Sequence, residues 1–154
     1  MILYLDTSSL VKLYVEEPGS GEVRRLAERA ELVGSSVVAY PEARAAFARR
    51  RRERSLTGDA HRRVAAAFDA DWPHVLALEV SDPLARSAGD LAERHRLRGF
   101  DAVHLATYLD LALEFPDETV HFSSADRSLA RAAAHARGKR GDSRRPTKRK
   151  RTAR

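Results

Sequence analysis

Short apolar runs alternate with longer amphipathic patterns along this chain, and that alternation limits the folds that are open to it. The run ILYL at 2–5 is too short and too continuous for an amphipathic helix, so it predicts a buried strand. Further strands are predicted near 32–35, over 75–80 and over 119–122. Because strands that alternate with helices favour a parallel sheet covered on both faces, we expect an α/β protein with a central, mostly parallel sheet flanked by helices.

Local signals mark where several of the helices begin and end. Pro41 is acceptable only in the first turn of a helix that runs to about residue 54, because its missing N–H has no intrahelical partner there. Ser81 is expected to cap the helix that follows the third strand. The clearest apolar stripe predicts a helix over 101–113, and a last helix is expected over 126–136.

The net charge of +6 is unevenly distributed along the 154 residues. Residues 137–154 hold ten Lys and Arg side chains and one Asp, so residues 1–136 are slightly acidic overall. The composition of the last segment is typical of a disordered tail. We therefore expect one folded domain over 1–136 and a basic, disordered C-terminal tail over 137–154.

Several protein classes are disfavoured by composition. Cysteine is absent, which excludes a disulfide-stapled scaffold and a zinc site built on thiolates. No apolar run approaches the roughly 18 residues that a membrane-spanning helix needs. The first residues lack the basic region of a signal peptide. A cytoplasmic protein with no membrane partner is the expectation.

Four acidic residues fall where strands end or helices begin. Asp6 directly follows the first strand, Glu42 lies in the first turns of the helix after the second strand, Asp101 opens the helix over 101–113, and Asp126 follows the fourth strand. In an open parallel sheet, the carboxyl ends of strands and the N-termini of helices share one edge. The four carboxylates could therefore meet there.

Each acid also has a local explanation. Asp101 and Asp126 suit the N-cap position of a helix, and Glu42 near a helix start is favoured by the helix dipole. Asp6 is harder to explain in this way, since Thr7 or Ser8 could cap the helix that follows it.

Four carboxylates at short range repel one another unless a cation neutralises them. Oxygen ligands without cysteine favour Mg²⁺ or Mn²⁺ over zinc. A bound divalent cation of this kind suits the hydrolysis of phosphodiester bonds, with one ion or with two.

The acids lie within the segments MILYLDTSSLVKLYVEEPGS, SSVVAYPEARAAFARR, RGFDAVHLATYL and FSSADRSLARAA. In this order the segments resemble the conserved blocks of PIN-domain proteins, in particular the VapC-type ribonuclease toxins of bacterial type II toxin–antitoxin systems. The match runs across 1–136, and it implies a three-layer PIN-like fold. It also implies a Mg²⁺-dependent endoribonuclease (Mn²⁺ being the other candidate ion) that acts on RNA, forms a homodimer and is inhibited by a cognate antitoxin protein.

The resemblance also assigns roles to residues. The implied catalytic residues are Asp6, Glu42, Asp101 and Asp126. Asp6 and Asp101 would be the principal metal ligands, and the other two acids would complete the pocket. Ser8 and Ser124 would be hydroxyl groups beside it, although either could simply cap a helix.

The chain departs from the family pattern after its last predicted helix. Such toxins usually continue through a Gly-Leu turn into one more short strand, whereas here AAAHARG leads directly into KRGDSRRPTKRKRTAR. A sheet edge without that strand exposes unpaired backbone groups, so we expect a weakened rim of the sheet.

Other features leave alternatives open. Arg49–Arg52 and Arg54 form either a solvated helix end or a phosphate contact beside the acids. The basic tail either adds RNA affinity or only increases solubility. Two other functions are a non-catalytic RNA-binding protein that uses these basic groups, and a phosphoryl-transfer enzyme with Asp6 as acceptor. His104 lies one turn after Asp101 and could approach the acids, but it is interpreted as a packing residue on its helix face.

Overall fold

A sheet of four parallel strands lies at the centre of the part of the chain that the structure describes. The computed structural model describes the backbone of residues 1–142 and the side chains of residues 1–138. The strands are β1 (Ile2–Leu5), β2 (Leu32–Ser36), β3 (Leu76–Leu78) and β4 (Val120–Ser123). Their spatial order is β3-β2-β1-β4, and every neighbouring pair is parallel. All four predicted strands are present, and the predicted α/β class is confirmed.

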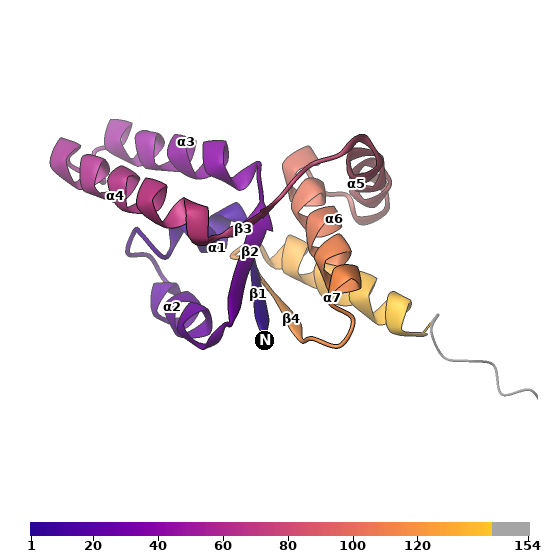
Figure 1. The fold of residues 1–154 in the computed structure, drawn as a ribbon. Coiled ribbons are helices and arrows are strands. Elements are labelled where there is room, and N and C mark those ends of the chain that lie inside the picture. Colours follow the sequence, from indigo (N-terminus) through magenta and orange to yellow (C-terminus); the bar gives the residue numbers. More distant parts are fainter. Residues whose placement is uncertain (143–154) are drawn as a thin grey trace, which may run out of the picture.

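Helices cover both faces of this sheet, which gives three layers (Figure 1). One face carries α1 (Thr7–Val11), α2 (Ser20–Arg29), α3 (Ala39–Arg52) and α4 (Gly58–Asp71). The other face carries α5 (Asp82–His95), α6 (Gly99–Glu114) and α7 (Arg127–Asp142). A short 3-10 helix, η1 (Trp72–His74), joins α4 to β3. None of the described helices is both long and apolar enough to cross a membrane.

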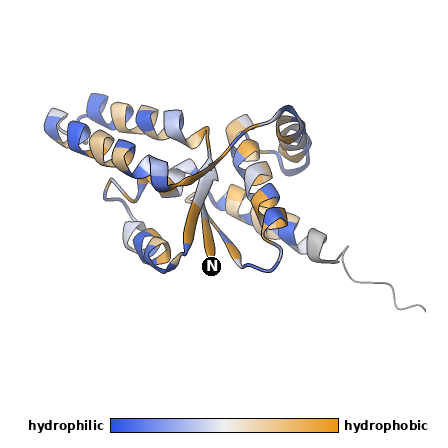
Figure 2. Cartoon of the chain, in the orientation of Figure 1, coloured by the Kyte–Doolittle hydropathy of each residue, from blue (hydrophilic) through white to orange (hydrophobic). Residues whose placement is uncertain are grey.

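The central strand β1 divides the hydrophobic core in two. Successive strand residues face opposite sides of a sheet, so Ile2 and Tyr4 pack against α5–α7, whereas Leu3 and Leu5 pack against α1–α4. All four side chains are buried. The strands are mostly hydrophobic in Figure 2, while the helices alternate hydrophobic and hydrophilic segments. A strand covered on both faces must be apolar at every position, which explains the unbroken run ILYL.

The helix boundaries follow the local signals except at the last helix. The Ser81 hydroxyl accepts a hydrogen bond from the Leu84 backbone N–H at 3.3 Å, so the predicted cap of α5 is confirmed. Pro41 is the third residue of α3 and lies in its first turn, as expected. Helix α7, however, continues to Asp142, beyond its predicted end at residue 136. Residues 143–154, most of the predicted tail, lie outside the described residues.

Arg137 covers the outer edge of the sheet. The carbonyls of Thr119 and Ser123 accept hydrogen bonds from the backbone N–H groups of Ile2 and Asp6, so the alternating Val120 carbonyl points to the opposite edge of β4. The Arg137 guanidinium, on α7, donates to this carbonyl and to the Tyr108 hydroxyl, the latter at 2.9 Å. A side chain therefore satisfies one of the backbone groups that this edge of the sheet would otherwise leave unpaired.

Candidate active site

One cleft at the carboxyl edge of the sheet contains all four predicted acids. This acidic cleft has a volume of about 590 Å³, and its walls include Asp6, Glu42, Asp101 and Asp126. Asp6 follows β1, Glu42 and Asp101 lie in the first turns of α3 and α6, and Asp126 immediately precedes α7. The fold therefore brings together four residues that span most of the chain, as the strand–helix pattern predicts.

Asp6 is held in one orientation by donors on both of its carboxylate oxygens. Its Oδ1 accepts from the Ser9 backbone N–H at 2.9 Å and from the Ser8 hydroxyl at 2.7 Å. Its Oδ2 accepts from the Ser124 hydroxyl at 2.6 Å. The residue is 4 % exposed and is itself the N-cap of α1. The interpretation in which Thr7 or Ser8 caps this helix is wrong, whereas both serines implied by the resemblance do lie beside Asp6.

Asp101 carries the clearest sign of charge crowding. Partial burial, followed by repulsion from Asp126 and Asp6, raises the pKa of Asp101, and the nearby His104 and Arg98 only partly offset this effect. The N-cap of α6 is Arg98, so the local explanation of Asp101 as a helix cap is wrong. Among the described residues, none donates a hydrogen bond to the Asp101 carboxylate. Both of its oxygens are therefore available to a ligand.

Asp126 does cap a helix, and it also faces the acidic cleft. Its Oδ1 accepts from the backbone N–H groups of Ser128 at 2.7 Å and Leu129 at 3.1 Å, at the start of α7. Its local explanation is therefore confirmed. Since these bonds use only Oδ1, Oδ2 can serve a ligand in the cleft at the same time.

Glu42 is ionised and held by two donors. Burial alone would raise the pKa of Glu42, but hydrogen bonds from His104 and Thr7 outweigh it, and the pKa is lowered overall. The Thr7 hydroxyl donates to Oε1 at 2.6 Å, and His104 Nε2 lies 3.0 Å from the same oxygen. Both partners contact Oε1, so Oε2 is the oxygen left for the cleft.

The donor set of the acidic cleft fits a hard divalent cation. Four carboxylates, with hydroxyl groups behind Asp6, offer only oxygen ligands, which Mg²⁺ and Mn²⁺ prefer. Among the side chains that the structure describes, residues 1–138, no three acidic or histidine side chains are close enough to form a complete ligand group. Mg²⁺ is usually bound through one or two carboxylates and keeps several waters, so a complete protein shell is not required.

Replacing Asp101 with Asn is expected to stabilise the protein when no divalent cation is present. The pKa of Asp101 is raised in the folded state, so its ionised form costs folding free energy at neutral pH. Asn removes the repulsion by Asp126 and Asp6. The gain should be present at pH 7 and should shrink as the pH falls through the raised pKa, because Asp101 is then protonated. Urea denaturation in EDTA at pH 7 and at pH 4 checks this; a loss of stability at pH 7 would contradict it.

Basic side chains form another wall of the acidic cleft. Of the basic run on α3, Arg49, Arg50 and Arg52 line the cleft, together with Arg98. Arg50 forms an ion pair with Glu17, and Arg49 lies 3.9 Å from Glu53. The three arginines of the run that line the cleft fit the interpretation as phosphate contacts. Arg51 and Arg54 do not line the cleft and fit the interpretation as a solvated helix end.

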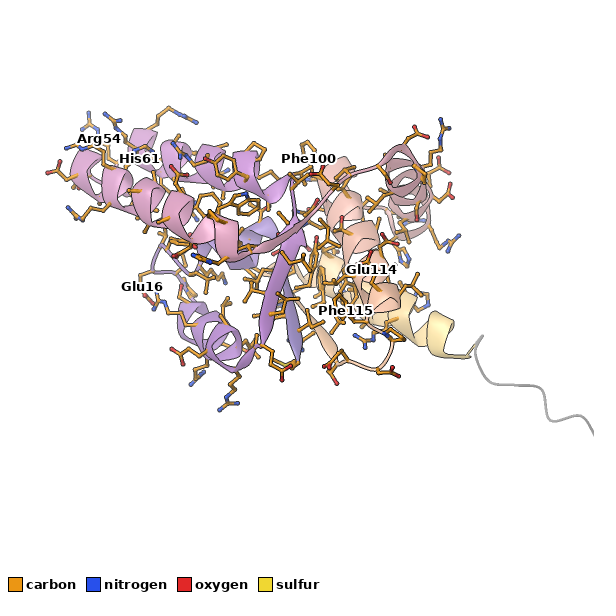
Figure 3. The ribbon with its side chains drawn as sticks, viewed as in Figure 1. Glu16, Arg54, His61, Phe100, Glu114 and Phe115 are labelled. Carbon is orange, nitrogen blue, oxygen red and sulfur yellow. The ribbon has the colours of Figure 1, made fainter. Side chains whose placement is uncertain are left out.

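A second cavity of about 620 Å³ adjoins the acidic cleft and shares Glu42, Arg98 and Asp101 with it. Its other walls are small residues of α5 and the first turn of α6. Phe100 stands at the end of α6 that lies at the carboxyl edge of the sheet (Figure 3). Its side chain is 59 % exposed. Space for an extended ligand therefore continues beyond the carboxylates.

Thr7 and Tyr4 belong to the site without a prediction from the sequence, and His104 approaches it as the alternative to packing allowed. The interpretation of His104 as a packing residue is incomplete, because this 2 % exposed side chain also contacts Glu42. In the sequence, the sign of this role is that His104 is a polar residue one turn after Asp101, within the apolar stripe of the helix. Thr7 follows Asp6 directly and could have been a candidate for that reason alone.

Comparison with known proteins decides the family. The family model described as PIN domain matches residues 3–135. The chain belongs to the PIN-domain family. The resemblance seen in the sequence and the PIN-like fold are thereby confirmed.

Two relatives cover most of the chain. The chain is 36 % identical to Ribonuclease VapC45 of Mycobacterium tuberculosis (strain CDC 1551 / Oshkosh) and equally to Ribonuclease VapC49 of Mycobacterium tuberculosis (strain ATCC 25618 / H37Rv). Each alignment spans 137 residues, which is 89 % of this chain and 92 % of the relative. Only a small part of either relative therefore lies outside the alignment.

Proposed function

We propose that this PIN-domain protein is a Mg²⁺- or Mn²⁺-dependent endoribonuclease and the toxin of a toxin–antitoxin pair. The observation that carries the proposal is the meeting of Asp6, Glu42, Asp101 and Asp126 in one cleft with charge crowding at Asp101. The ribonuclease names of two relatives that align over almost their whole length support RNA as the substrate. The cognate antitoxin, the homodimer and the cytoplasmic location belong to the same proposal.

Asp6 and Asp101 are the residues proposed to hold the cation. A bound Mg²⁺ would polarise the scissile phosphate and lower the pKa of a coordinated water. Asp6 is aimed by Ser8 and Ser124, and Asp101 presents a carboxylate that receives no hydrogen bond from the described residues. Asp126 adds negative charge through Oδ2, which its capping bonds leave available.

Glu42 is proposed to accept a proton from the attacking water at Oε2. Its lowered pKa keeps it ionised at neutral pH, and Oε1 is occupied by Thr7 and His104. A general base must be deprotonated before the reaction, and the lowered pKa of Glu42 supports that state at neutral pH. The arginines of the basic wall would contact phosphates on either side of the scissile bond.

The alternative in which Asp6 accepts a phosphoryl group has weaker support. The two relatives that align with this chain are named ribonucleases, which favours phosphodiester hydrolysis over phosphorylation of Asp6. Non-catalytic RNA binding would use the basic wall but gives no reason for the four acids beside it.

Cleavage of RNA by the full chain tests the proposal. Purified protein incubated with a mixture of structured RNAs should produce discrete fragments in Mg²⁺ or Mn²⁺, and EDTA should stop the reaction. Restoring the cation in excess of EDTA should restore cleavage. RNA that is retarded in a native gel but remains intact with either cation would instead support the non-catalytic alternative and contradict the proposed activity.

A further inference from the structure

A series of hydrogen bonds leads from the buried core of the sheet to the partly buried wall of the acidic cleft. The Tyr4 hydroxyl lies 3.0 Å from Nδ1 of His104. On the other side of the ring, Nε2 lies 3.0 Å from the Thr7 hydroxyl and 3.0 Å from Oε1 of Glu42. Tyr4 and His104 are almost completely buried. These hydrogen bonds therefore connect β1, α6, α1 and α3 through side chains alone.

The proton positions along this series of hydrogen bonds follow from the available donors and acceptors. The Thr7 hydroxyl has one proton and donates it to Glu42 Oε1, so toward His104 the Thr7 oxygen can only accept. Nε2 faces two acceptors and must carry a hydrogen. A phenol keeps its proton at neutral pH, so the Tyr4 hydroxyl can donate to an unprotonated Nδ1. Every bond is satisfied by a neutral imidazole with its hydrogen on Nε2.

We propose that His104 is a positioning residue. Tyr4 holds His104 in the Nε2–H tautomer. In that form His104 and Thr7 together fix Oε1 of Glu42 and leave Oε2 toward the cleft. This inference rests on the proposed function of Glu42 as the proton acceptor. Without its two donors, a glutamate with three rotatable side-chain bonds would sample several orientations. Misplacing a reacting group by about 1 Å can cost on the order of a hundredfold in rate.

The two amide substitutions of His104 separate positioning from packing. His104→Gln places an amide N–H near the position of Nε2 and so keeps a donor for Glu42. His104→Asn is shorter, keeps only an acceptor near the position of Nδ1, and loses that donor. With an RNA oligonucleotide that the wild-type protein cleaves, we expect His104→Asn to lower kcat by about 10–100-fold with little change in KM, and His104→Gln to stay within a few-fold of wild type. Equal kcat values for the two variants would overturn the proposal.

Matched tyrosine variants test this series of hydrogen bonds if both His104 variants are poorly folded. Tyr4 and Tyr108 are buried neighbours with ring centroids 5.9 Å apart, but the Tyr108 hydroxyl contacts Arg137 and not the site. Tyr4→Phe should lower kcat several-fold, and Tyr108→Phe should leave kcat unchanged. Thr7→Val should also lower kcat, while Thr7→Ser, which keeps the hydroxyl, should retain it. A Tyr4→Phe protein with wild-type kcat would contradict the role of Tyr4.

The tautomer itself can be measured without RNA. In a ¹⁵N-labelled wild-type protein, long-range ¹H–¹⁵N correlations distinguish the two neutral forms of each histidine, and His104→Gln identifies the signals of this residue. We expect an unprotonated Nδ1 and a protonated Nε2. A proton on Nδ1 alone would overturn the inference even if RNA cleavage is observed, whereas absence of cleavage with the expected tautomer would contradict only the proposed function of the site.

Discussion

Replacing Asp6 with Asn is expected to reduce RNA cleavage by at least about a hundredfold while the protein remains folded. Asn has the same shape as Asp, and its amide oxygen can still accept the Ser9 N–H that caps α1. The Ser8 hydroxyl, which also lies 2.9 Å from Oδ2, and the Ser124 hydroxyl can rotate to accept from the amide nitrogen at that position. The substitution thus removes a buried negative charge and a cation ligand with little change in packing. Initial rates of cleavage in saturating Mg²⁺ measure the effect.

A matched control for this variant is Asp110→Asn. Asp110 is an exposed residue of α6 and is not among the residues that line the acidic cleft. It undergoes the same chemical change, and its variant should cleave RNA at the wild-type rate. If a folded Asp6→Asn protein cleaves as fast as Asp110→Asn, Asp6 has no part in the reaction.

Replacing Phe68 with Ala is expected to destabilise the protein by about 3–5 kcal/mol, a large share of the stability of an ordinary domain. The Phe68 ring is fully buried on α4 and packs against four aromatic rings with centroids 5.4–5.6 Å away: Tyr14, Tyr40, Phe47 and Trp72. Truncation leaves a cavity between α4 and α3, the helix that carries Glu42. Trp72 is the only tryptophan, so its fluorescence during urea denaturation reports unfolding of this cluster.

Phe100→Ala provides the comparison for Phe68→Ala. It removes the same ring from a position that is 59 % exposed, and its cost should stay within about 1 kcal/mol. Similar losses of stability in the two variants would mean that the aromatic cluster around Phe68 does not hold α4 against the core.

The sequence predicts much of the fold because the strongest signals are local. An apolar run such as ILYL is compatible with few environments other than a covered parallel strand. The meeting of the four acids also follows from topology, since parallel strands share one carboxyl edge. The extent of α7 was less predictable, because the contacts that Arg137 makes with Tyr108 and Val120 depend on elements distant in sequence.

The finer arrangement of the site was beyond sequence reasoning for a similar reason. Glu42 and His104 are 62 positions apart, and no periodicity links them. The local explanations of Asp101 and Asp126 looked equally good, yet only Asp126 caps its helix. Only the tertiary structure shows whether such a side-chain oxygen caps a helix or is available to bind a ligand.

Binding of Mn²⁺ tests the central claim most directly, because it needs neither the RNA target nor an antitoxin. Electron paramagnetic resonance of free Mn²⁺, titrated with the wild-type protein and with Asp6→Asn, gives the fraction of the ion that is bound. The wild-type protein should bind Mn²⁺, Mg²⁺ should displace it, and Asp6→Asn should bind it at least about tenfold more weakly. Equal Mn²⁺ binding by the two proteins, or none by the wild type, would contradict the assignment of the acidic cleft as a cation site.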